Sequence, residues 1–135
     1  MAERTLVLVK PDGVRRGLVG TIIARFEAKG FEIVALNQRT LDKEMADQHY
    51  AEHVEKGWYP ELREFITSGP LVSLVLSGDK AIEVVRLMVG ATDARAAAPG
   101  TVRGDLALSN QANLIHASDS AESAVREIAL FFPEL

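Results

Sequence analysis

The chain has 135 residues, of which 47% are apolar and 25% are charged, the proportions of an ordinary globular protein. This length suits one hydrophobic core, so we expect residues 1–135 to form a single domain. The net charge of −4 excludes an overall basic field that would hold nucleic acid, and we expect no specific nucleic-acid partner. The absence of cysteine excludes disulfide bridges and thiolate metal sites.

The sequence also predicts the cellular location of the protein. No apolar run approaches the roughly 20 residues of a membrane-spanning helix, so we expect no membrane partner. The first residues pass directly into a strand-like pattern, without the longer apolar run and cleavage site of a signal peptide. We therefore expect a cytoplasmic protein.

Hydrophobic periodicity predicts alternating strands and helices. Short apolar runs bounded by turn residues are typical of buried strands, and apolar residues three and four apart are typical of amphipathic helices. The predicted strands cover residues 5–9, 31–39, 71–76 and 114–116. The predicted helices cover residues 19–29, 42–53, 61–67, 81–89 and 120–132. Two glycine-containing stretches, residues 10–13 and 77–79, are predicted to be turns.

The order of these elements contains two strand–helix–strand halves. It predicts an α+β, ferredoxin-like βαββαβ sandwich, in which helices pack on a four-stranded antiparallel sheet. The first and third strands are apolar at nearly every position, so both faces of the sheet should be covered. The cover would come from the short helices after the second strand or from another subunit. Residues 90–112 lack sustained periodicity, and we expect an ordered functional loop there.

His116 is the candidate nucleophile. It ends a predicted strand just before a helix, whose N-terminal N–H groups and partial positive charge suit an anion. Ser118 and Asp119 supply polar groups beside it, and Glu127 lies two turns along the helix, where its carboxylate could orient the imidazole. Such a set of groups supports covalent catalysis. The alternative is a core histidine whose ring nitrogens are simply satisfied.

Three cations could serve the same histidine. Lys10 follows the first strand, Arg86 lies on a later helix, and Arg103 lies in the long loop together with Thr92. In the predicted sheet the first and last strands are antiparallel neighbours, so the lysine side chain could cover much of the roughly 10 Å along the last strand to His116. Phosphoryl transfer depends on positioning and charge neutralisation. These residues therefore indicate that chemistry, although each cation alone could be a surface charge.

Other patterns leave alternatives open. His49 and His53 are four residues apart in a helical stretch, a spacing that could hold zinc. Tyr50 could direct its hydroxyl to a phosphate or could pack at the edge of the core. Trp58 and Leu62 could form a core pair or a platform on which a base stacks.

The absence of several known catalytic motifs narrows the classes of enzyme to which the chain could belong. The sequence contains neither the G-x-x-x-x-G-K-S/T phosphate loop nor the protein-kinase signatures. A Ser–His–Asp hydrolase would need the near-adjacent Ser118, His116 and Asp119 to align, and the G-x-S-x-G elbow is absent.

The residues around His116 resemble the signature of the nucleoside diphosphate kinase family. The resemblance covers essentially the whole chain and joins several motifs in one order, which makes it highly specific. They are Lys10-Pro11-Asp12, the helix around Phe26, His49-Tyr50, Thr67-Ser68-Gly69-Pro70, Gly90-Ala91-Thr92, Ala98-Pro99-Gly100-Thr101-x-Arg103 and Asn113-x-x-His116-Ala117-Ser118-Asp119-Ser120.

The resemblance implies transfer of the γ-phosphoryl group from a nucleoside triphosphate to a nucleoside diphosphate, by ping-pong through a phosphohistidine at His116. Base specificity would be broad, because a base held by stacking rejects little. Mg2+ would be held by the nucleotide phosphates and not by a protein metal site. The family forms homo-oligomers, and we favour the hexamer over the tetramer. The alternative is a non-enzymatic nucleotide-binding or regulatory module on the same fold.

By matching position, the resemblance also implies roles for individual residues. The catalytic residues would be His116, Glu127, Lys10, Tyr50 and Ser118. The nucleotide would contact Lys10, Trp58, Leu62, Arg86, Thr92, Arg103 and Asn113.

Three residues depart from the family pattern. Ala117, Trp58 and Asn110 stand where glycine, phenylalanine and an apolar residue are usual in the family. If position 117 required a positive φ, alanine there would cost on the order of 1 kcal/mol.

Overall fold

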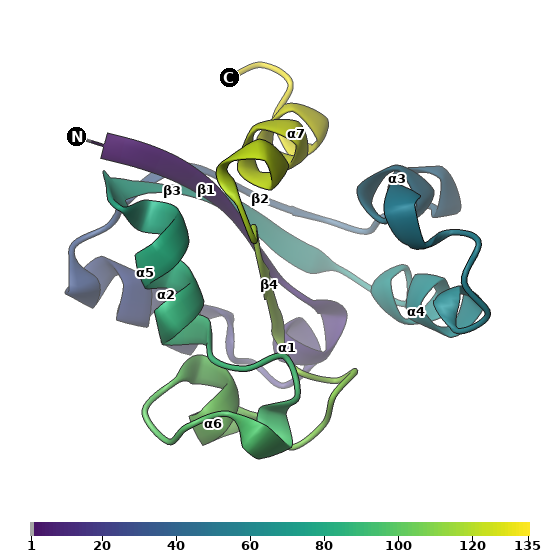
Figure 1. Cartoon of the computed structure of the whole chain (residues 1–135), viewed down its shortest axis with the longest axis horizontal. Coiled ribbons are helices and arrows are strands. Elements are labelled where there is room, and N and C mark those ends of the chain that lie inside the picture. The colour runs from purple at the N-terminus through teal and green to yellow at the C-terminus, as the bar shows by residue number, and fades with distance from the viewer. Residues whose placement is uncertain (1) are drawn as a thin grey trace.

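The computed structural model describes residues 2–135, which form one four-stranded sheet with helices on both faces (Figure 1). The strands are β1 (Ala2–Val9), β2 (Glu32–Arg39), β3 (Leu71–Asp79) and β4 (Ile115–Ala117). The α-helices are α1 (Pro11–Arg15), α2 (Val19–Lys29), α3 (Lys43–His49), α4 (Tyr59–Ile66), α5 (Ala81–Val89), α6 (Val102–Leu106) and α7 (Ala121–Phe131). The short 3-10 helices are η1 (Ala51–His53) and η2 (Ala94–Ala96). None of the described helices is long and apolar enough to cross a membrane.

The sheet has the strand order β2-β3-β1-β4, and each neighbouring pair is antiparallel. This order confirms the predicted α+β, ferredoxin-like sandwich. β1 is central and pairs with β3 along its whole length and with β4 over three residues. The C-terminal end of β1 therefore lies beside the strand that carries His116.

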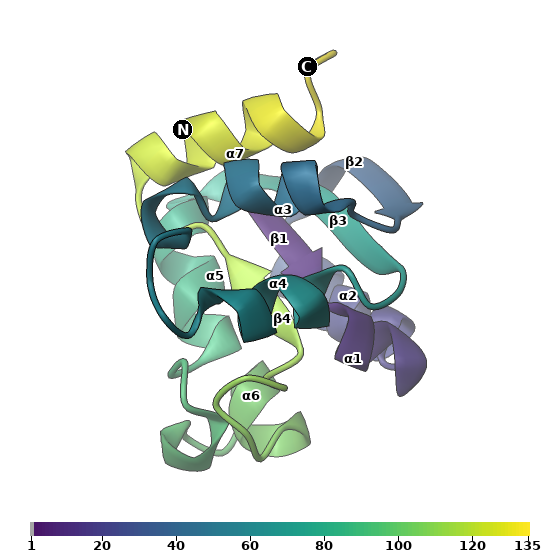
Figure 2. The same cartoon turned by 90° about the vertical axis from the view of Figure 1, so that its right-hand side faces the viewer.

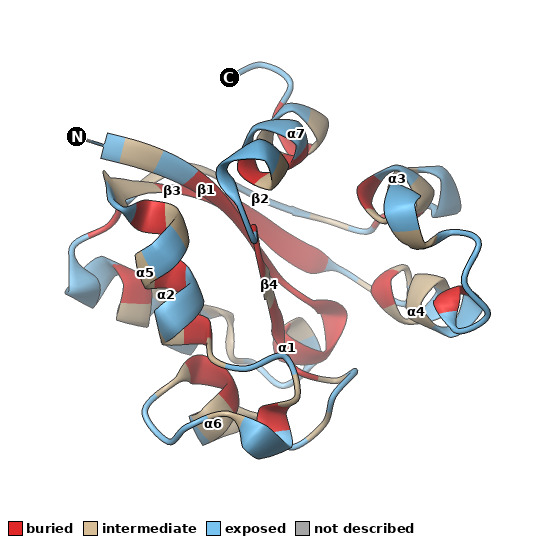
Figure 3. Ribbon diagram, in the orientation of Figure 1, coloured by how far each residue is buried: buried red, intermediate tan, exposed pale blue. Residues whose placement is uncertain are grey.

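Two hydrophobic clusters lie on opposite faces of the sheet, with the buried central strands between them (Figure 3). Val7 and Val9 pack with Phe26 of α2 and with α5, whereas Leu6 and Leu8 pack with residues from α3, α4 and α7. Alternate residues of β1 enter different clusters because successive side chains of a strand point to opposite faces. The prediction that both faces are covered is confirmed. This chain covers the second face itself, with α3 and α4 in front of the sheet and α7 above it in Figure 2.

The predicted turn after β1 is wrong, because these residues form the short helix α1. Pro11 occupies the first position of α1, where the fixed φ of proline is compatible with a helix. Gly13 meets a packing constraint: a Cβ atom there would lie 2.8 Å from Val9 Cγ1 and 3.2 Å from the carbonyl oxygen of Leu114. The glycine thus permits α1 to pack closely against the chain that leads into β4.

The predicted turn at residues 77–79 is also wrong, because β3 continues through Asp79. A Cβ atom at Gly78 would lie 2.5 Å from Cδ1 of Phe31, so glycine leaves room for that ring. Gly78 still pairs with Glu3 of β1. The glycine here marks a close approach to the strand and not its end.

Two other segments differ from the sequence prediction. The predicted helix at residues 42–53 is interrupted at Tyr50, which ends α3 with φ −102° and ψ 31°. The loop expected at residues 90–112 contains η2 and α6, whose N-caps are the side chains of Asp93 and Thr101. Capping hydrogen bonds of this kind stabilise short helical turns that show no apolar periodicity.

Candidate active site

The strand register places Lys10 and His116 on one face of the sheet. His116 pairs with Leu8 in the β1–β4 ladder, and Lys10 stands two residues beyond Leu8 in extended conformation. Residues two apart on a strand share a face. Lys10 accordingly reaches α4, where its Nζ lies 5.4 Å from the centroid of the Phe65 ring. The backbone N–H of Lys10 donates to the carbonyl oxygen of Leu114 at 2.8 Å, so the end of β1 does meet the start of β4.

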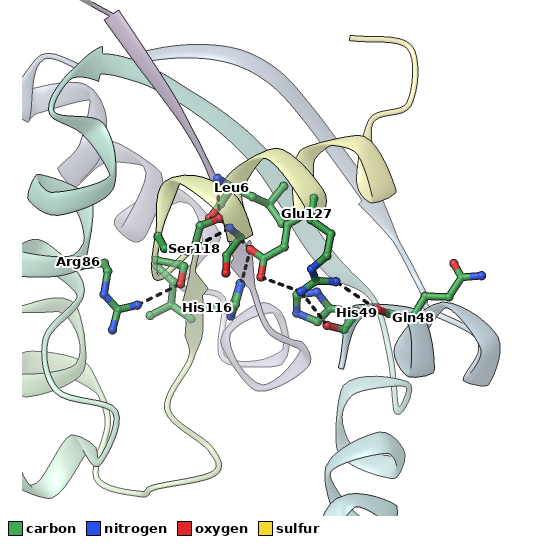
Figure 4. Close-up of polar contacts among 12 residues, drawn as sticks. Leu6, Gln48, His49, Arg86, His116, Ser118 and Glu127 are labelled. Carbon is green, nitrogen blue, oxygen red and sulfur yellow. Dashed lines mark hydrogen bonds and ion pairs between the residues drawn. The ribbon is translucent and has the colours of Figure 1, made fainter. Parts of the chain in front are cut away.

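A chain of hydrogen bonds holds the His116 ring (Figure 4). Nε2 of His116 lies 3.0 Å from Oε1 of Glu127, and Ser118 Oγ donates to the same carboxylate oxygen at 2.7 Å. The backbone N–H of Leu6 donates to Ser118 Oγ at 3.2 Å. The Glu127 side chain is 5% exposed and the His116 side chain 24%. The carboxylate therefore orients the ring from the interior while the ring remains accessible.

The charge of Glu127 decides which nitrogen of His116 is free. Burial by itself would raise the pKa of this carboxyl, but the hydrogen bond and charge of His116, together with the Ser118 hydroxyl, outweigh burial and lower the pKa to about 2. Near neutral pH Glu127 is a carboxylate, which only accepts hydrogen bonds. Nε2 must then carry the imidazole proton. The lone pair resides on Nδ1, so the ring offers a nucleophilic nitrogen away from Glu127.

Lys10 is a buried cation, with 6% of its surface exposed. Its Nζ donates to the carbonyl oxygen of Gln111 at 3.1 Å. Burial lowers the pKa of Lys10 to about 8, with Asp12 opposing the shift and Arg103 adding to it. An anion beside Nζ would stabilise the charged form of this lysine.

Arg86 and Arg103 are placed differently. The guanidinium of Arg103, which is 8% exposed, donates to three carbonyl oxygens. They belong to Gly90 at 3.0 Å, Asn113 at 3.4 Å and Ile115 at 2.6 Å. Burial and the nearby Arg86 lower the pKa of Arg103 to about 10, so it remains charged at neutral pH. Arg86 is exposed on α5 and donates to the carbonyl oxygen of Ala117 at 3.3 Å. Arg103 thus clamps residues 90–115 as well as supplying charge.

One pocket of about 570 Å3, a volume typical of small-molecule sites, is lined by Lys10, Arg86, Arg103 and His116. Trp58 precedes α4 and is 52% exposed, so it lies outside the core, and Leu62 lies one turn further along α4. Asn113 donates to the carbonyl oxygens of Thr92 and Asn110, and its Oδ1 has no hydrogen-bond partner within residues 2–135. Besides His116 and Tyr50, the pocket is lined by every residue predicted to contact the nucleotide: Lys10, Trp58, Leu62, Arg86, Thr92, Arg103 and Asn113.

The structure removes two of the alternatives. His49 ends α3 and His53 lies in η1, and the cluster of possible metal ligands in the described part of the chain joins His49 to His116 and Glu127. The structure therefore gives no support to His49 and His53 as a pair of zinc ligands, the alternative that their spacing left open. Ser118 is fully buried and donates its hydroxyl proton to Glu127, which is incompatible with a hydrolase nucleophile.

The positive φ near His116 occurs at Leu114 and not at Ala117. Ala117 belongs to β4 and lies outside the left-handed region, so alanine carries no backbone cost there. Leu114 has φ 74° and is fully buried. Its N–H donates to Asp12 Oδ2 at 3.0 Å, and its carbonyl accepts from Lys10, so bonds to α1 and β1 hold this conformation.

Sequence reasoning missed several residues of the pocket and one direct neighbour of His116. His53, Glu61 and Gln111 also line the pocket. His49 packs edge-on against His116, with the ring centroids 4.8 Å apart, and burial together with His116 lowers its pKa to about 3. The placement of His49 follows from the docking of α3 on the sheet, and no sequence motif signals that contact.

A nucleophilic imidazole surrounded by cations suits the transfer of an anionic group. Phosphoryl transfer in particular depends on such charge neutralisation and positioning. The half-exposed indole of Trp58 adds a surface on which a flat base could stack. Fold and site together define the class of nucleotide-dependent phosphotransferases.

Comparison with known proteins makes this class specific. Residues 3–135 match the family model of nucleoside diphosphate kinase. The chain is 65% identical over 135 residues to the nucleoside diphosphate kinase of a Nocardioides species, with 100% of both chains covered. It is 60% identical over 133 residues to that of Thermobifida fusca, with 98% of both covered. A solved halophilic nucleoside diphosphate kinase from Halobacterium salinarum, in complex with CDP, is 50% identical with a TM-score of 0.95, covering 98% of this chain and 88% of that one. The chain belongs to the nucleoside diphosphate kinase family and is a phosphotransferase acting on nucleotides.

Proposed function

We propose that the enzyme carries the γ-phosphoryl group from a nucleoside triphosphate to a nucleoside diphosphate on Nδ1 of His116. The observation that carries this proposal is the 3.0 Å contact of Nε2 with the Glu127 carboxylate, which leaves the lone pair on Nδ1. In the first half-reaction that lone pair attacks the γ-phosphorus. The bond to the bridging oxygen breaks, and the nucleoside diphosphate leaves with the electron pair. Glu127 stabilises the positive charge that develops on the ring.

The second half-reaction reverses these steps with a different nucleotide. A terminal oxygen of the entering diphosphate attacks the phosphorus, the N–P bond breaks, and its electron pair returns to Nδ1. Lys10, Arg86 and Arg103 neutralise the charge on the phosphate oxygens in both directions. Thr92 and Tyr50 add hydroxyl donors at the same pocket. Ser118 acts behind the ring by donating to Glu127.

The base is proposed to stack on Trp58 and to contact Leu62, while Asn113 hydrogen-bonds the sugar through its free Oδ1. The relative from Halobacterium salinarum was solved with CDP, which supports a nucleotide in the corresponding pocket. Stacking is tolerant of base identity, because every base offers a flat face. The proposed specificity is therefore broad.

Mg2+ is proposed to enter on the nucleotide phosphates. Within residues 2–135 the one cluster of three possible ligands, formed by His49, His116 and Glu127, offers a single carboxylate. Mg2+ prefers six oxygen ligands and retains several of its waters. Asp119 and Glu61 line the pocket and could hold such waters. The bound ion would supply additional positive charge at the transferring phosphate.

Family membership also suggests the domain organisation, oligomeric state and cellular location of the protein. We propose that residues 1–135 form one nucleoside diphosphate kinase-like domain that assembles as a homo-oligomer, a hexamer in preference to a tetramer. Supporting self-association, β2 lies at the edge of the sheet and its Leu36 is 54% exposed. The proposed location is the cytoplasm, where nucleoside triphosphates are made and used. Mass measurement of the assembly in solution tests its number of subunits.

The test of the proposed reaction is transfer of labelled phosphate from ATP to GDP. His116→Gln should lower the rate at least about 1,000-fold, because it removes the nucleophile. The matched control is Arg95→Gln, a change at an exposed residue paired with Asp93 outside the pocket lining, which should leave the rate unchanged. Nucleotide binding by the wild type without transfer would replace this proposal with a non-enzymatic nucleotide-binding module.

A further inference from the structure

His49 is a buried histidine without a role in the proposed reaction. It is 3% exposed, and neither ring nitrogen has a hydrogen-bond partner among the residues that the structure describes. A buried polar group without a partner costs free energy, and native proteins rarely leave one in this state. Packing alone does not account for an imidazole here, since phenylalanine would fill the same space without that cost.

The surroundings of His49 point to the missing partner. Its ring lies against Phe131 on one side, at 5.3 Å between centroids, and against His116 at 4.8 Å. Figure 4 shows His49 beside the Glu127 carboxylate and near the His116 ring. One ligand atom from each of His49, His116 and Glu127 lies within 4.8 Å of the other two. The unpartnered imidazole therefore faces a histidine and a carboxylate at once.

We propose that His49, His116 and Glu127 form a binding site for a zinc-like transition-metal ion, and that its occupation blocks phosphoryl transfer. Two imidazoles and one carboxylate form a ligand set of catalytic zinc sites, in which water takes the fourth position. On tetrahedral zinc with bonds of about 2.1 Å, neighbouring ligand atoms lie roughly 3.4 Å apart. The 3.0 Å between His116 Nε2 and Glu127 Oε1 is already close to that value. Because its ligand atom lies within 4.8 Å of the other two, His49 must approach by at most about 1.4 Å to complete the site.

The same ligand set separates the inhibitory metal from Mg2+. Imidazole nitrogen is a good ligand for Zn2+, Cu2+ and Ni2+, whereas Mg2+ requires oxygen ligands in an octahedron. With two of its three protein ligands being nitrogen, the site excludes the ion that accompanies the nucleotide. An excess of Mg2+ would not displace zinc from it.

Metal binding blocks the reaction through the imidazole tautomer. A metal ion at Nε2 takes the electron pair of that nitrogen, so the proton that Nε2 carried moves to Nδ1. Nδ1 then has an N–H bond and no lone pair to attack phosphorus. The proton is conserved within the ring, and no oxidant or reductant is needed. This inhibitory consequence rests on the proposed function, whereas metal binding itself does not.

The binding test uses Zn2+ alone, titrated into nucleotide-free enzyme against a chromophoric chelator. The wild type should bind one ion per chain, and His49→Phe should weaken its affinity at least about 10-fold by removing a ligand. The matched control is His53→Phe, because His53 is the third histidine of the chain and lies outside the cluster. Unchanged affinity in His49→Phe, or loss of affinity in His53→Phe, would overturn the site. His49→Gln, which keeps a polar side chain, repeats the measurement in case the phenylalanine variant does not fold.

The inhibition test measures phosphoenzyme formation after zinc has been bound and free ion removed. Phosphorylation of the wild type should fall in proportion to zinc occupancy. This loss should persist in excess Mg2+ and should be reversed by chelation of the zinc. His49→Phe should resist the same treatment. Normal phosphorylation of zinc-loaded enzyme would overturn the inhibitory role. Failure of the zinc-free enzyme to form phosphohistidine with ATP and Mg2+ would instead refute the proposed function. It would leave the result of the zinc-binding test unchanged.

Discussion

Replacing Glu127 by glutamine tests how the carboxylate prepares His116 for attack. The wild-type carboxylate accepts from His116 Nε2 at 3.0 Å and from Ser118 Oγ at 2.7 Å. Glutamine keeps the shape of the side chain and one acceptor oxygen but removes the charge. The nitrogen that develops positive charge during transfer then loses its counterion. We expect slower phosphorylation of His116 with little change in nucleotide binding.

The size of this effect follows from the hydrogen bonds. A bond to a charged partner contributes about 1.5–3 kcal/mol and a neutral one about 0.5–1.5 kcal/mol. Losing the charge therefore costs about 1–2 kcal/mol, which corresponds to a roughly 5- to 30-fold slower step. A rapid-quench assay of phosphoenzyme formation at saturating ATP measures this step directly. The control is Glu122→Gln, which removes a carboxylate from an exposed position in the first turn of α7.

The same variant has a predicted effect on stability. Glu127 has its pKa lowered from 4.5 to about 2, so its charged form contributes about 3 kcal/mol at roughly 1.4 kcal/mol per pKa unit. This contribution is present above about pH 4.5 and is lost as the pH falls toward 2. Urea unfolding should show the wild type losing more stability than Glu127→Gln over that interval. In the rapid-quench assay, a rate of phosphoenzyme formation by Glu127→Gln within twofold of the wild-type rate, or an effect of the substitution confined to KM, would refute this account of Glu127.

Three further predictions concern the pocket. Because the pKa of Lys10 is about 8, the kcat/KM of the wild type should fall as the pH rises through that value and the lysine loses its charge. The Lys10→Met variant should have a low kcat/KM that does not show this fall. A variant with the same pH profile as the wild type would contradict the assignment. Trp58→Ala should raise KM about 10-fold for purine and pyrimidine nucleotides alike while leaving phosphorylation at saturating ATP intact, and a loss confined to one base would argue against simple stacking. Arg103→Met should lower the free energy of unfolding by about 2 kcal/mol or more, because it leaves three carbonyl oxygens without their hydrogen-bond donor. Arg86→Met should change the free energy of unfolding by less than about 0.5 kcal/mol. Equal losses of stability in urea titrations of the two variants would be inconsistent with their different environments.

The sequence was sufficient for the fold class because the hydrophobic patterns of its strands and main helices are unambiguous. It failed where a glycine serves tertiary packing. Gly13 and Gly78 look like turn residues in the sequence, but each makes room for a neighbour that only the folded chain brings close. Short helices such as α6 depend on caps and show no periodicity. Their residues therefore give little local signal.

The site was predictable to the extent that its chemistry lies in a few motifs. His116 and Glu127 stand at a spacing that places them together, and strand order explains the approach of Lys10. The position of His49 could not be predicted, because it depends on how α3 docks against the sheet. The clamp formed by Arg103 was equally hidden, since its acceptors are backbone carbonyls, which carry no sequence signal.

The central claim is that phosphate passes through His116, and isolation of the phosphoenzyme tests it most directly. Incubation with γ-labelled ATP and Mg2+, followed by removal of nucleotide, should leave label on the protein that is stable in base, labile in acid and fully transferable to GDP. His116→Gln should retain no label. Transfer from ATP to GDP without a labelled intermediate, or label that persists in the His116→Gln protein, would contradict the account.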